Sequence, residues 1–568
     1  MYLMALATDY DGTLAEDGAV RPETLEALKR LKETGRKLLL VTGRELPDLK
    51  RVFPHTDLFD KVVVENGALL YTPDSDEEKL IAPAPPPEFV ARLRQKGVDN
   101  ISVGRSIVAT WEPHQTAALE AINELGLELE IIFNKGAVMV LPSGVNKATG
   151  LKSAIEEMQL SFLNVVAVGD AENDHALLRT VGCGVAVANA LPALKDTADL
   201  VLVGARGEGV EELIAEIIER DHALCVNKRH RIPIGEDDDG PAEIGPRDVL
   251  LIAGSSGSGK SMLVTAVSER LQERRSQFCV FDAEGDYEGL EGTVTVGSSL
   301  VPPTESEIVE LLANPDNNVV INALGLEVEE HPEFFSKLMP SLSAFRAKTG
   351  RPHWLIIDEA HLALPASRDS ASLALADDRS GMIMITVHPD SVSPDVLAAV
   401  TAVAAFGPAA REAIEALCAA VGEAPPDGLD EPEADDEVLF WQRSSAAPVR
   451  RIRVEKPRQA RKRHTRKYAE GHLDEEASFY FRGPEQEMNL RAHNLTAFLQ
   501  IAEGINDETW EHHLRGGDYS QWFEESIGDA ELAEEAAGVE EDRSLSPAES
   551  RDRIAEAVRR RYTAPALG

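Results

Sequence analysis

The chain has 568 residues and a formal net charge of -41 at pH 7, and 43% of its residues are hydrophobic. At about 150 residues per domain, this length predicts three or four domains, each able to bury its own core. The negative charge opposes unspecific binding to nucleic acids or anionic membranes over most of the surface and favours solubility.

The cysteine pattern and the lack of a long apolar run indicate in which cellular compartment the protein is expected. Four cysteines are widely spaced, and no two form a C-x-x-C pair, which argues against a disulfide framework or a zinc site. No charged-then-apolar signal segment opens the sequence, and the most apolar later stretch, 396–410, is interrupted by Thr401, Gly407 and Pro408. We therefore expect a cytoplasmic protein with no membrane span.

The first informative element is a short apolar run, residues 4–7, which predicts a buried parallel strand. Asp9-Tyr10-Asp11-Gly12-Thr13 follows it directly. Because side chains alternate along an extended chain, Asp9 and Asp11 can point the same way, and two carboxylates then share one pocket.

Three further stretches have the residue types that a phosphate-handling site needs. Thr42-Gly43-Arg44 follows the apolar run 38–41, and Gly169-Asp170-Ala171-Glu172-Asn173-Asp174 follows the apolar run 165–168. Lys147 lies between them in the sequence. Alone, each piece is typical of a solvated turn, a strand end or a surface charge. Their joint occurrence in this order favours a catalytic site.

This arrangement resembles the haloacid dehalogenase superfamily, in the Cof-like and sucrose-phosphate-phosphatase-like subclass, over roughly residues 1–215. The resemblance implies that Asp9 attacks phosphorus to form an aspartyl phosphate and that Asp11 protonates the leaving oxygen and later activates water. It implies that Thr42 and Lys147 bind the phosphoryl oxygens. The expected Mg²⁺ ligands are Asp9, Asp11, Asp170 and Asp174, with Asn173 beside them.

An insertion of about 82–143 has room for a cap within a phosphatase domain at 1–220. The patterns predict a helix at 87–95, a strand pair over 100–111 turned at Gly104, a helix at 113–125 and a strand pair over 128–141 turned at Gly136. Such an αββαββ lid excludes water and contacts the leaving group, so substrate choice is expected there. Candidate substrate contacts are Arg105, Trp111, Glu112, His114 and Asn134, although each residue type is more often an ordinary surface or packing residue.

A second domain is predicted at 246–425, after a linker at 221–245 whose Gly/Asp/Pro-rich part is 234–241. The apolar run 249–253 leads into a complete G-x-x-x-x-G-K-S phosphate loop and then an amphipathic pattern. In such a loop Gly254, Gly257 and Gly259 let backbone N–H groups surround a phosphate, Lys260 adds positive charge and Ser261 can bind Mg²⁺. We expect ATP as the ligand.

A second apolar run, 354–357, ends in Asp358 and Glu359, which suits support of the Mg²⁺ shell and activation of attacking water. With Phe281-Asp282 and the stretch 385–397, this region resembles the HerA/FtsK-like ATPases, which are usually ring-forming motors, so a homo-oligomer through this domain is expected. One departure is Val387-His388, where such motors commonly have a polar sensor: either His388 substitutes or turnover is slow. Arg346 and Arg351 are either fingers across a subunit boundary or, more often for such residues, surface arginines.

Beyond residue 425 we expect a hairpin and a basic linker at 426–467, then a helical module at 468–568 with a disordered tip. The basic runs 450–453 and 461–467 either bind nucleic acid or a phosphorylated ligand, or dock on a neighbouring acidic surface. The module resembles an uncharacterised bacterial domain. Its His512-His513 pair is a poor metal site, since adjacent helical residues diverge by about 100°, and a core or partner-binding role is favoured.

The overall expectation is an α/β multidomain protein: a Rossmann-like haloacid dehalogenase core with a small α+β cap, a P-loop NTPase domain and a mainly helical C-terminal module. The leading function is Mg²⁺-dependent hydrolysis of a small phosphorylated metabolite, such as a sugar phosphate, joined to ATP binding and hydrolysis. One alternative is an ATP-driven nucleic-acid motor or repair factor with a polynucleotide-end phosphatase. Another is a kinase paired with a phosphatase on one substrate, against which Asp358-Glu359 argues.

Overall fold

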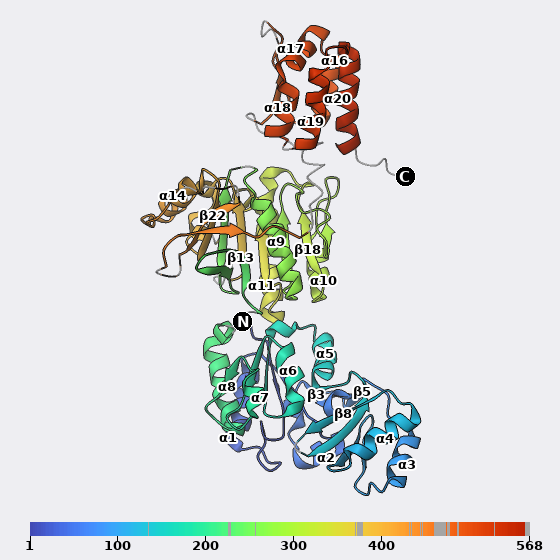
Figure 1. Ribbon diagram of the computed structural model, residues 1–568. Helices are drawn as coiled ribbons and strands as arrows, with labels where there is room; N and C mark the ends of the chain where they lie inside the picture. The colour runs from blue at the N-terminus through green and yellow to red at the C-terminus, as the bar shows by residue number, and fades with distance from the viewer. Residues whose placement is uncertain are drawn as a thin grey trace.

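The structure, a computed structural model, describes all of the chain except residues 135, 225–228, 256, 370, 372–378, 431, 433, 435, 444, 446, 459–472, 474–476, 485–487, 528 and 563–568. Figure 1 shows three bodies stacked along the chain: an α/β body with a side lobe, a second α/β body and a helical module. The expected α/β multidomain class is confirmed. Within the described part, no helix is both long and apolar enough to cross a membrane.

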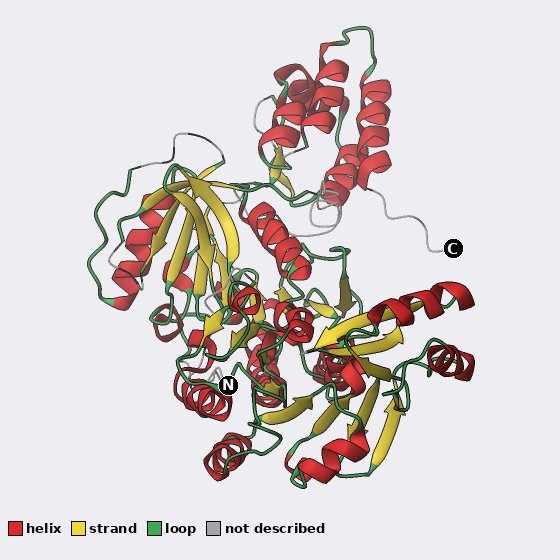
Figure 2. Ribbon diagram, turned by 60° about the horizontal axis from the view of Figure 1, so that its bottom comes forward, coloured by secondary structure: helices red, strands yellow, loops and turns green. Residues whose placement is uncertain are grey.

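The first body is built on an eight-stranded sheet in the order β12-β11-β10-β1-β2-β3-β4-β5. Its parallel strands are short apolar runs with helices on both faces (Figure 2), which is why they bury nearly every residue. The parallel strands are β1 (Ala5–Thr8), β2 (Lys37–Val41), β3 (Lys61–Val64), β10 (Val165–Gly169), β11 (Cys183–Ala186) and β12 (Leu200–Val201). β4 (Leu69–Thr72) and β5 (Glu77–Leu80) extend the sheet antiparallel. The helices are α1 (Pro22–Glu33), α2 (Leu46–Val52), α5 (Lys147–Glu157), α6 (His175–Thr180), α7 (Pro192–Lys195) and α8 (Arg206–Arg220).

The side lobe is the inserted cap, a four-stranded antiparallel sheet with two helices on it. Its elements are α3 (Pro87–Gln95), β6 (Ser102–Val103), β7 (Val108–Trp111), α4 (Gln115–Leu125), β8 (Leu129–Asn134) and β9 (Ala137–Pro142). The strand order is β6-β7-β9-β8, so the two hairpins share one sheet. This αββαββ sequence of elements is the one that the apolar patterns predict.

The second body contains an eleven-stranded sheet in the order β14-β13-β23-β22-β21-β15-β20-β19-β16-β18-β17. Its parallel part consists of β15 (Val249–Gly254), β16 (Phe278–Asp282), β17 (Thr293–Val296), β18 (Asn318–Asn322), β19 (Trp354–Ile357), β20 (Met382–Thr386) and β21 (Ala402–Phe406). Its helices include α9 (Lys260–Glu273), α10 (Glu305–Ala313), α11 (His331–Thr349), α12 (Ala360–Ala363), α13 (Pro394–Leu397) and α14 (Ala410–Val421).

The stretch 234–241 differs from the linker expected there. It forms most of a hairpin, β13 (Ile232–Asp237) and β14 (Gly240–Ile244), at the edge of the second sheet. Ile232 and Ile234 are buried in the same core cluster as Leu250 and Ile252. The Gly/Asp/Pro-rich composition belongs to the hairpin's turn, because the alternating apolar residues lie on either side of it.

The hairpin expected after residue 425 is formed by β22 (Glu437–Gln442) and β23 (Arg450–Val454). It joins β21 to β13, so it belongs to the second sheet. Arg450 pairs with Asp237 of β13. The basic run 461–467 lies outside the described residues.

The C-terminal module has a small hairpin, β24 (Phe479–Phe481) and β25 (Leu490–Ala492), and the helices α16 (Leu495–Gly504), α17 (Asp507–Gly516), α18 (Asp518–Glu525), α19 (Ala530–Glu541) and α20 (Pro547–Tyr562). Its core is aromatic, and Trp510 stacks on Tyr519. His513 is buried and lies 2.6 Å from Asp518, whereas His512 is exposed, and the two rings touch edge-on with their centres 5.2 Å apart. The tip that was expected to be disordered, 563–568, lies outside the described residues.

The two α/β bodies meet at the amino-terminal ends of their strands. His353, just before β19, lies 3.0 Å from the Asn164 side chain, just before β10. Arg351 donates to the Gln159 carbonyl over 2.6 Å. Because functional residues of parallel sheets follow the carboxyl ends, the two candidate sites face away from each other.

Candidate active site

Three buried aspartates meet at the carboxyl edge of the first sheet. Asp9 follows β1, Asp170 follows β10, and Asp174 ends the short helix η4 (Glu172–Asp174). One carboxylate oxygen from each lies within 4.8 Å of the others. The sheet places them there because β1 and β10 are adjacent and parallel, with Thr8 opposite Val168.

Lys147 lies among these carboxylates. It is the first residue of α5, which is held by a capping box between Asn146 and Thr149. Its ammonium nitrogen is 2.6 Å from an oxygen of Asp9 and 2.6 Å from an oxygen of Asp174, and the side chain is 1% exposed. Backbone N–H groups of Asp170 and Ala171 donate to the second oxygen of Asp174. This network fixes the orientation of the cluster.

Electrostatics favour a divalent cation at this place. Three carboxylates and one ammonium leave two formal negative charges in a buried region, and desolvation opposes that charge. Burial raises the pKa of Asp9 to about 7, although the Lys147 charge opposes the shift. Burial lowers the pKa of Lys147, but the Asp174 and Asp9 charges outweigh it and raise the value overall. Carboxylate oxygens are hard ligands, and the site needs two positive charges to become neutral, so it fits Mg²⁺.

Asp11, expected as a fourth metal ligand, does not join the aspartate cluster through its side chain. Its carboxylate accepts two hydrogen bonds of 2.7 Å from Arg44. Arg44 also lies 2.5 Å from Asp48, one turn along α2. A bidentate guanidinium therefore holds the Asp11 carboxylate, and the role of Asp11 as a metal ligand stays a prediction. Thr42, at the end of β2, is buried and its hydroxyl accepts from the Arg44 N–H over 3.2 Å.

The segment Glu65–Gly67 connects the parts of this site, and the sequence analysis assigned it no role. The Asn66 N–H donates to the Thr42 carbonyl, and its side-chain oxygen accepts from Asn173 over 2.9 Å. Gly67 has φ +107, and a Cβ there would lie 1.9 Å from the Asn146 carbonyl oxygen. Only glycine therefore allows the chain before Lys147 to approach so closely.

Glu65 attaches the cap to this segment. Its carboxylate is 1% exposed and accepts backbone N–H bonds from Arg105, Ser106 and Ile107 over 2.7–3.1 Å. The turn between β6 and β7 is thereby held against the core. In the sequence this segment is marked only by the stretch Val64-Glu65-Asn66-Gly67 after an apolar run. Its contacts lie too far away in sequence to be inferred from spacing.

The cap residues proposed as substrate contacts are dispersed. Arg105 lies 3.2 Å from Glu78, Trp111 is 57% exposed, and Glu112 is exposed next to it. His114 and Asn134 are half-buried. Instead, Met139 of β9 reaches the core, with its methyl carbon 3.2 Å from where a Cβ on Gly43 would lie. The cap therefore places an apolar side chain next to Gly43, which follows β2.

The phosphate loop lies at the carboxyl end of β15, at the start of α9. Gly254, Gly257 and Gly259 have φ of +147, +79 and +103, which other residues rarely adopt. Lys260 is buried and donates to the Gly254 and Ser255 carbonyls over 2.8 and 2.7 Å. Ser261 follows as the second residue of α9. The carbonyls of the loop thus bind the Lys260 ammonium, and a bound phosphate would compete with them for it.

Acidic residues gather beside this loop at the ends of β16 and β19. Burial, together with the charges of Asp286, Glu359, Asp282 and Glu284, raises the pKa of Asp358 well above its ordinary value. Burial raises the pKa of Asp282 to about 7. Such a crowded carboxylate site favours a cation or a bound proton.

The end of β20 provides a group of polar side chains that includes His388, the candidate substitute for the polar sensor. Thr386, opposite Ala253 of β15, has its hydroxyl 3.2 Å from His361 and accepts from the His388 N–H over 3.0 Å. The His361 and His388 rings are 5.7 Å apart, next to Glu359. Thr386, His361 and His388 therefore form a polar group at the position where Val387 itself is apolar.

Arg346 and Arg351 lie at the opposite end of the sheet from the phosphate loop. Arg351 is fully buried and donates to the Gln277 side chain and the Leu312 carbonyl. Arg346 donates to the Pro352 and His353 carbonyls. Arg351 is therefore not a surface arginine, and a finger role of Arg346 across a subunit boundary stays a prediction.

Comparison with known proteins matches two parts of the chain to families. Residues 6–103 and 112–214 match the haloacid dehalogenase-like hydrolases, and residues 248–349 match the central domain of helicase HerA. A phosphoglycolate phosphatase of Methanothermobacter thermautotrophicus is 29% identical over 221 residues, which is 37% of this chain and 97% of that protein. Phosphoglycolate phosphatase 2 of Saccharolobus solfataricus is 29% identical over 221 residues, with 38% and 91% covered. A solved haloacid dehalogenase-like hydrolase from Bacteroides thetaiotaomicron aligns with TM-score 0.33 and 20% identity over 38% of this chain and 98% of its own.

These matches support a phosphomonoester hydrolase of the haloacid dehalogenase type, joined to a HerA-type domain that suggests ATPase activity. The resemblance of the C-terminal module to an uncharacterised bacterial domain stays a prediction.

Proposed function

We propose that this chain, with its haloacid dehalogenase-like hydrolase domain and its HerA-type domain, is a Mg²⁺-dependent phosphatase of a small phosphorylated metabolite that also binds and hydrolyses ATP. The observation that carries the phosphatase proposal is the buried cluster of Asp9, Asp170 and Asp174 around Lys147. A phosphate monoester dianion repels nucleophiles, so such a site needs a fixed nucleophile and local positive charge.

In the proposed reaction an Asp9 oxygen attacks phosphorus, and the bond from phosphorus to the leaving oxygen breaks. Asp11, at the mouth of the site, gives its proton to that oxygen. Asp11 then takes a proton from water, which attacks the aspartyl phosphate and releases inorganic phosphate with Asp9 restored. Since Arg44 donates two hydrogen bonds to the Asp11 carboxyl group, the donor role requires these contacts to open when substrate binds.

Asp9, Asp170 and Asp174 would hold the Mg²⁺, which supplies charge neutralisation for the phosphoryl oxygens when bound. Lys147 orients the Asp9 carboxylate and, with the Thr42 hydroxyl, binds phosphoryl oxygens in the proposal. The cap excludes water through Met139 and the Glu65-anchored turn, which limits the space to a small leaving group.

A small organic phosphate is the substrate class that this enclosed site fits best. The matched curated relatives are phosphoglycolate phosphatases, and sugar phosphates are the alternative of similar size. The test is phosphate release from a panel holding 2-phosphoglycolate, hexose phosphates and nucleoside monophosphates, with wild type and Asp9→Asn in Mg²⁺. Release by wild type alone supports the proposal, and equal release by both proteins contradicts it.

The HerA-type domain favours ATP turnover as a second activity, since Lys260 and Asp358 lie at the phosphate loop and its acidic partner strand. Lys260→Ala is expected to abolish ATPase activity and to leave phosphatase activity unchanged. The observation that favours a nucleic-acid motor instead is the HerA match itself. Unchanged ATP turnover with DNA or RNA at low salt, and no binding, would remove that candidate.

The two catalytic edges face away from each other, which argues against a kinase and a phosphatase sharing one bound substrate. Failure to transfer labelled γ-phosphate to any acceptor in the substrate panel would remove that reading.

A further inference from the structure

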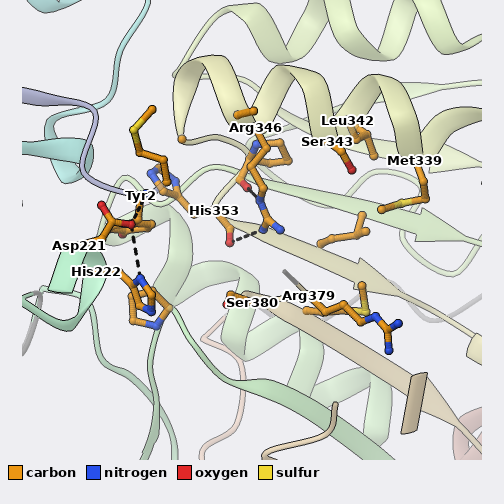
Figure 3. Close-up of a pocket in the computed structure, with 17 residues that line it drawn as sticks. Tyr2, Asp221, His222, Met339, Leu342, Ser343, Arg346, His353, Arg379 and Ser380 are labelled. Atoms are coloured by element: carbon orange, nitrogen blue, oxygen red, sulfur yellow. Dashed lines mark hydrogen bonds and ion pairs between the residues drawn. The ribbon is translucent and has the colours of Figure 1, made fainter. Parts of the chain in front are cut away.

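A cavity of about 220 Å³ lies at the junction of the two α/β bodies, and its walls come from both (Figure 3). The first body provides the chain start and the end of α8. The second provides α11 and the first residues of β19 and β20. Its lining includes the polar side chains of Tyr2, Asp221, His222, Ser343, Arg346 and Arg379.

Most of the remaining wall is apolar. Met339 and Leu342 come from α11, Leu355 from β19 and Met382 from β20, and all four are buried. Methionine side chains are adaptable and pack well against aromatic rings. An apolar cavity of about 150 Å³ binds benzene, so the volume of this cavity matches a ligand with one ring.

The polar groups lie at two separate sides of the cavity. Figure 3 shows Tyr2, Asp221 and His222 together on one side, and Arg346 projecting from α11 on another. Asp221 accepts from the Tyr2 and Leu3 N–H groups over 2.7 and 3.0 Å and pairs with Arg36 at 2.9 Å. Its charge is thus compensated from outside the cavity, whereas Arg346 and Arg379 bring two positive charges to the lining.

Two buried nitrogen atoms of the lining have no hydrogen-bond partner: Nε2 of His222 and Nε of Arg379. Nδ1 of His222 lies 3.5 Å from the Asp221 carboxylate. With a single ring proton on Nδ1, facing that carboxylate, Nε2 is a hydrogen-bond acceptor. A buried acceptor and a buried guanidinium donor each favour a polar ligand atom.

We propose that this cavity binds a small aromatic hydroxycarboxylate. Its carboxylate meets the Arg346 and Arg379 side, its ring lies among Met339, Leu355 and Met382, and its hydroxyl donates to Nε2 of His222. This proposal does not depend on which substrate the phosphatase takes.

The cavity lies near the start of strands that lead to both candidate sites. Tyr2 precedes β1, which leads to Asp9, and Leu355 and Met382 lie on strands that lead to Asp358 and Thr386. A ligand that binds only the docked arrangement stabilises the junction by mass action. Its binding therefore favours one relative placement of the two bodies.

The test uses the full chain with 4-hydroxyphenylacetate as the probe, measured by titration calorimetry and by the shift in thermal unfolding. Ser343→Trp fills the cavity from a half-buried helical position, and Ala344→Trp adds the same ring at the next, exposed position. We expect the same Kd for wild type and Ala344→Trp and at least tenfold weaker binding for Ser343→Trp. No binding by wild type, or equal Kd for both variants, overturns the proposal.

Two comparisons test the ligand chemistry separately from the volume. 4-Hydroxyphenylacetamide, which has no charge, is expected to bind wild type at least tenfold more weakly, and equal affinity overturns the carboxylate assignment. Phenylacetate is expected to bind wild type about fivefold more weakly than the hydroxylated probe, as for one hydrogen bond. His222→Phe should bring that ratio to about one, and an unchanged ratio overturns the role of Nε2.

Discussion

Arg44 holds the Asp11 carboxylate through two hydrogen bonds of 2.7 Å, so the expected proton donor of the reaction is part of an ion pair. The same guanidinium lies 2.5 Å from Asp48, which fixes it to α2. The position of Asp11 at the mouth of the site therefore depends on a residue that follows the neighbouring strand.

Replacing Arg44 by Gln should impair proton transfer more than phosphate binding. General acid–base catalysis contributes about 10²–10⁴-fold, and a misplaced Asp11 forfeits part of it, so we expect about a tenfold fall in kcat for alkyl phosphates. Aryl phosphates, whose leaving group needs little protonation, should show a smaller fall in the burst rate of phenol release. Arg51→Gln is the control, because Arg51 is exposed and pairs with Asp48 alone. Equal losses for alkyl and aryl substrates would contradict the positioning role.

Replacing Lys147 by Gln should destabilise the metal-free protein. The variant leaves the Asp9 and Asp174 carboxylates buried without their ammonium partner, and breaking a buried pair on one side costs about 3–5 kcal/mol. Urea unfolding of the first transition, with and without Mg²⁺, measures the loss. Mg²⁺ should restore part of it. Lys152→Gln, on the exposed face of α5, should change neither curve. A Lys147→Gln variant as stable as wild type without Mg²⁺ would refute this account of the cluster.

Replacing Glu65 by Gln should loosen the cap while the catalytic groups stay in place. Three N–H donors then face one remaining oxygen and an NH₂ group, which costs about 1–3 kcal/mol. Hydrogen exchange at the amides of residues 105–107 should accelerate about tenfold or more, and KM should rise. Glu78→Gln removes only the exposed contact to the Arg105 side chain and serves as the control. Unchanged exchange at these amides would show that Glu65 does not hold the turn.

The junction of the two α/β bodies should weaken in acid. His230 contacts the Tyr2 hydroxyl and the Gly182 carbonyl, and burial lowers its pKa to about 4. Burial also lowers the pKa of His353 well below its ordinary value. In the unfolded chain both histidines bind a proton near pH 6.5, whereas in the folded chain they do not. The part of the unfolding free energy that they contribute is therefore fully present above pH 6.5 and is lost as the pH falls towards 4.

For His230 this difference amounts to about 2 kcal/mol between pH 7 and pH 5. His230→Gln should flatten the fall in unfolding free energy over that range by about this amount, measured by urea unfolding at both values. His512→Gln, at an exposed position, should leave the fall as in wild type. Buried acids such as Asp282, whose pKa is raised to about 7, act with the opposite sign, so the comparison between variants is the test.

The sequence located the stretches at Asp9, Thr42 and Asp170 because each follows an apolar run that forms a strand. Asp9 and Asp170 needed only the rule that parallel strands end at one edge. The pairing of Asp11 with Arg44 needed side-chain geometry that spacing does not contain. For the same reason Glu65 could not be linked to residues 105–107, which lie about forty positions away on the cap.

Composition misled where a hairpin has a polar turn. The Asp-rich turn of β13 and β14 outweighed the alternation of Ile232 and Ile234, and β23, the second strand that pairs with β13, is distant in sequence. Docking between bodies also leaves no local pattern: the fully buried Arg351 donates to the Gln159 carbonyl of the other body.

The most direct measurement is acid-quench trapping of the enzyme during turnover of a ³²P-labelled substrate from the panel. The account predicts acid-stable, hydroxylamine-labile label on the peptide that contains Asp9, with none on Asp9→Asn and more on Asp11→Asn, whose dephosphorylation is slowed. Turnover by wild type with no label on that peptide, or equal label on Asp9→Asn, would contradict the covalent role of Asp9.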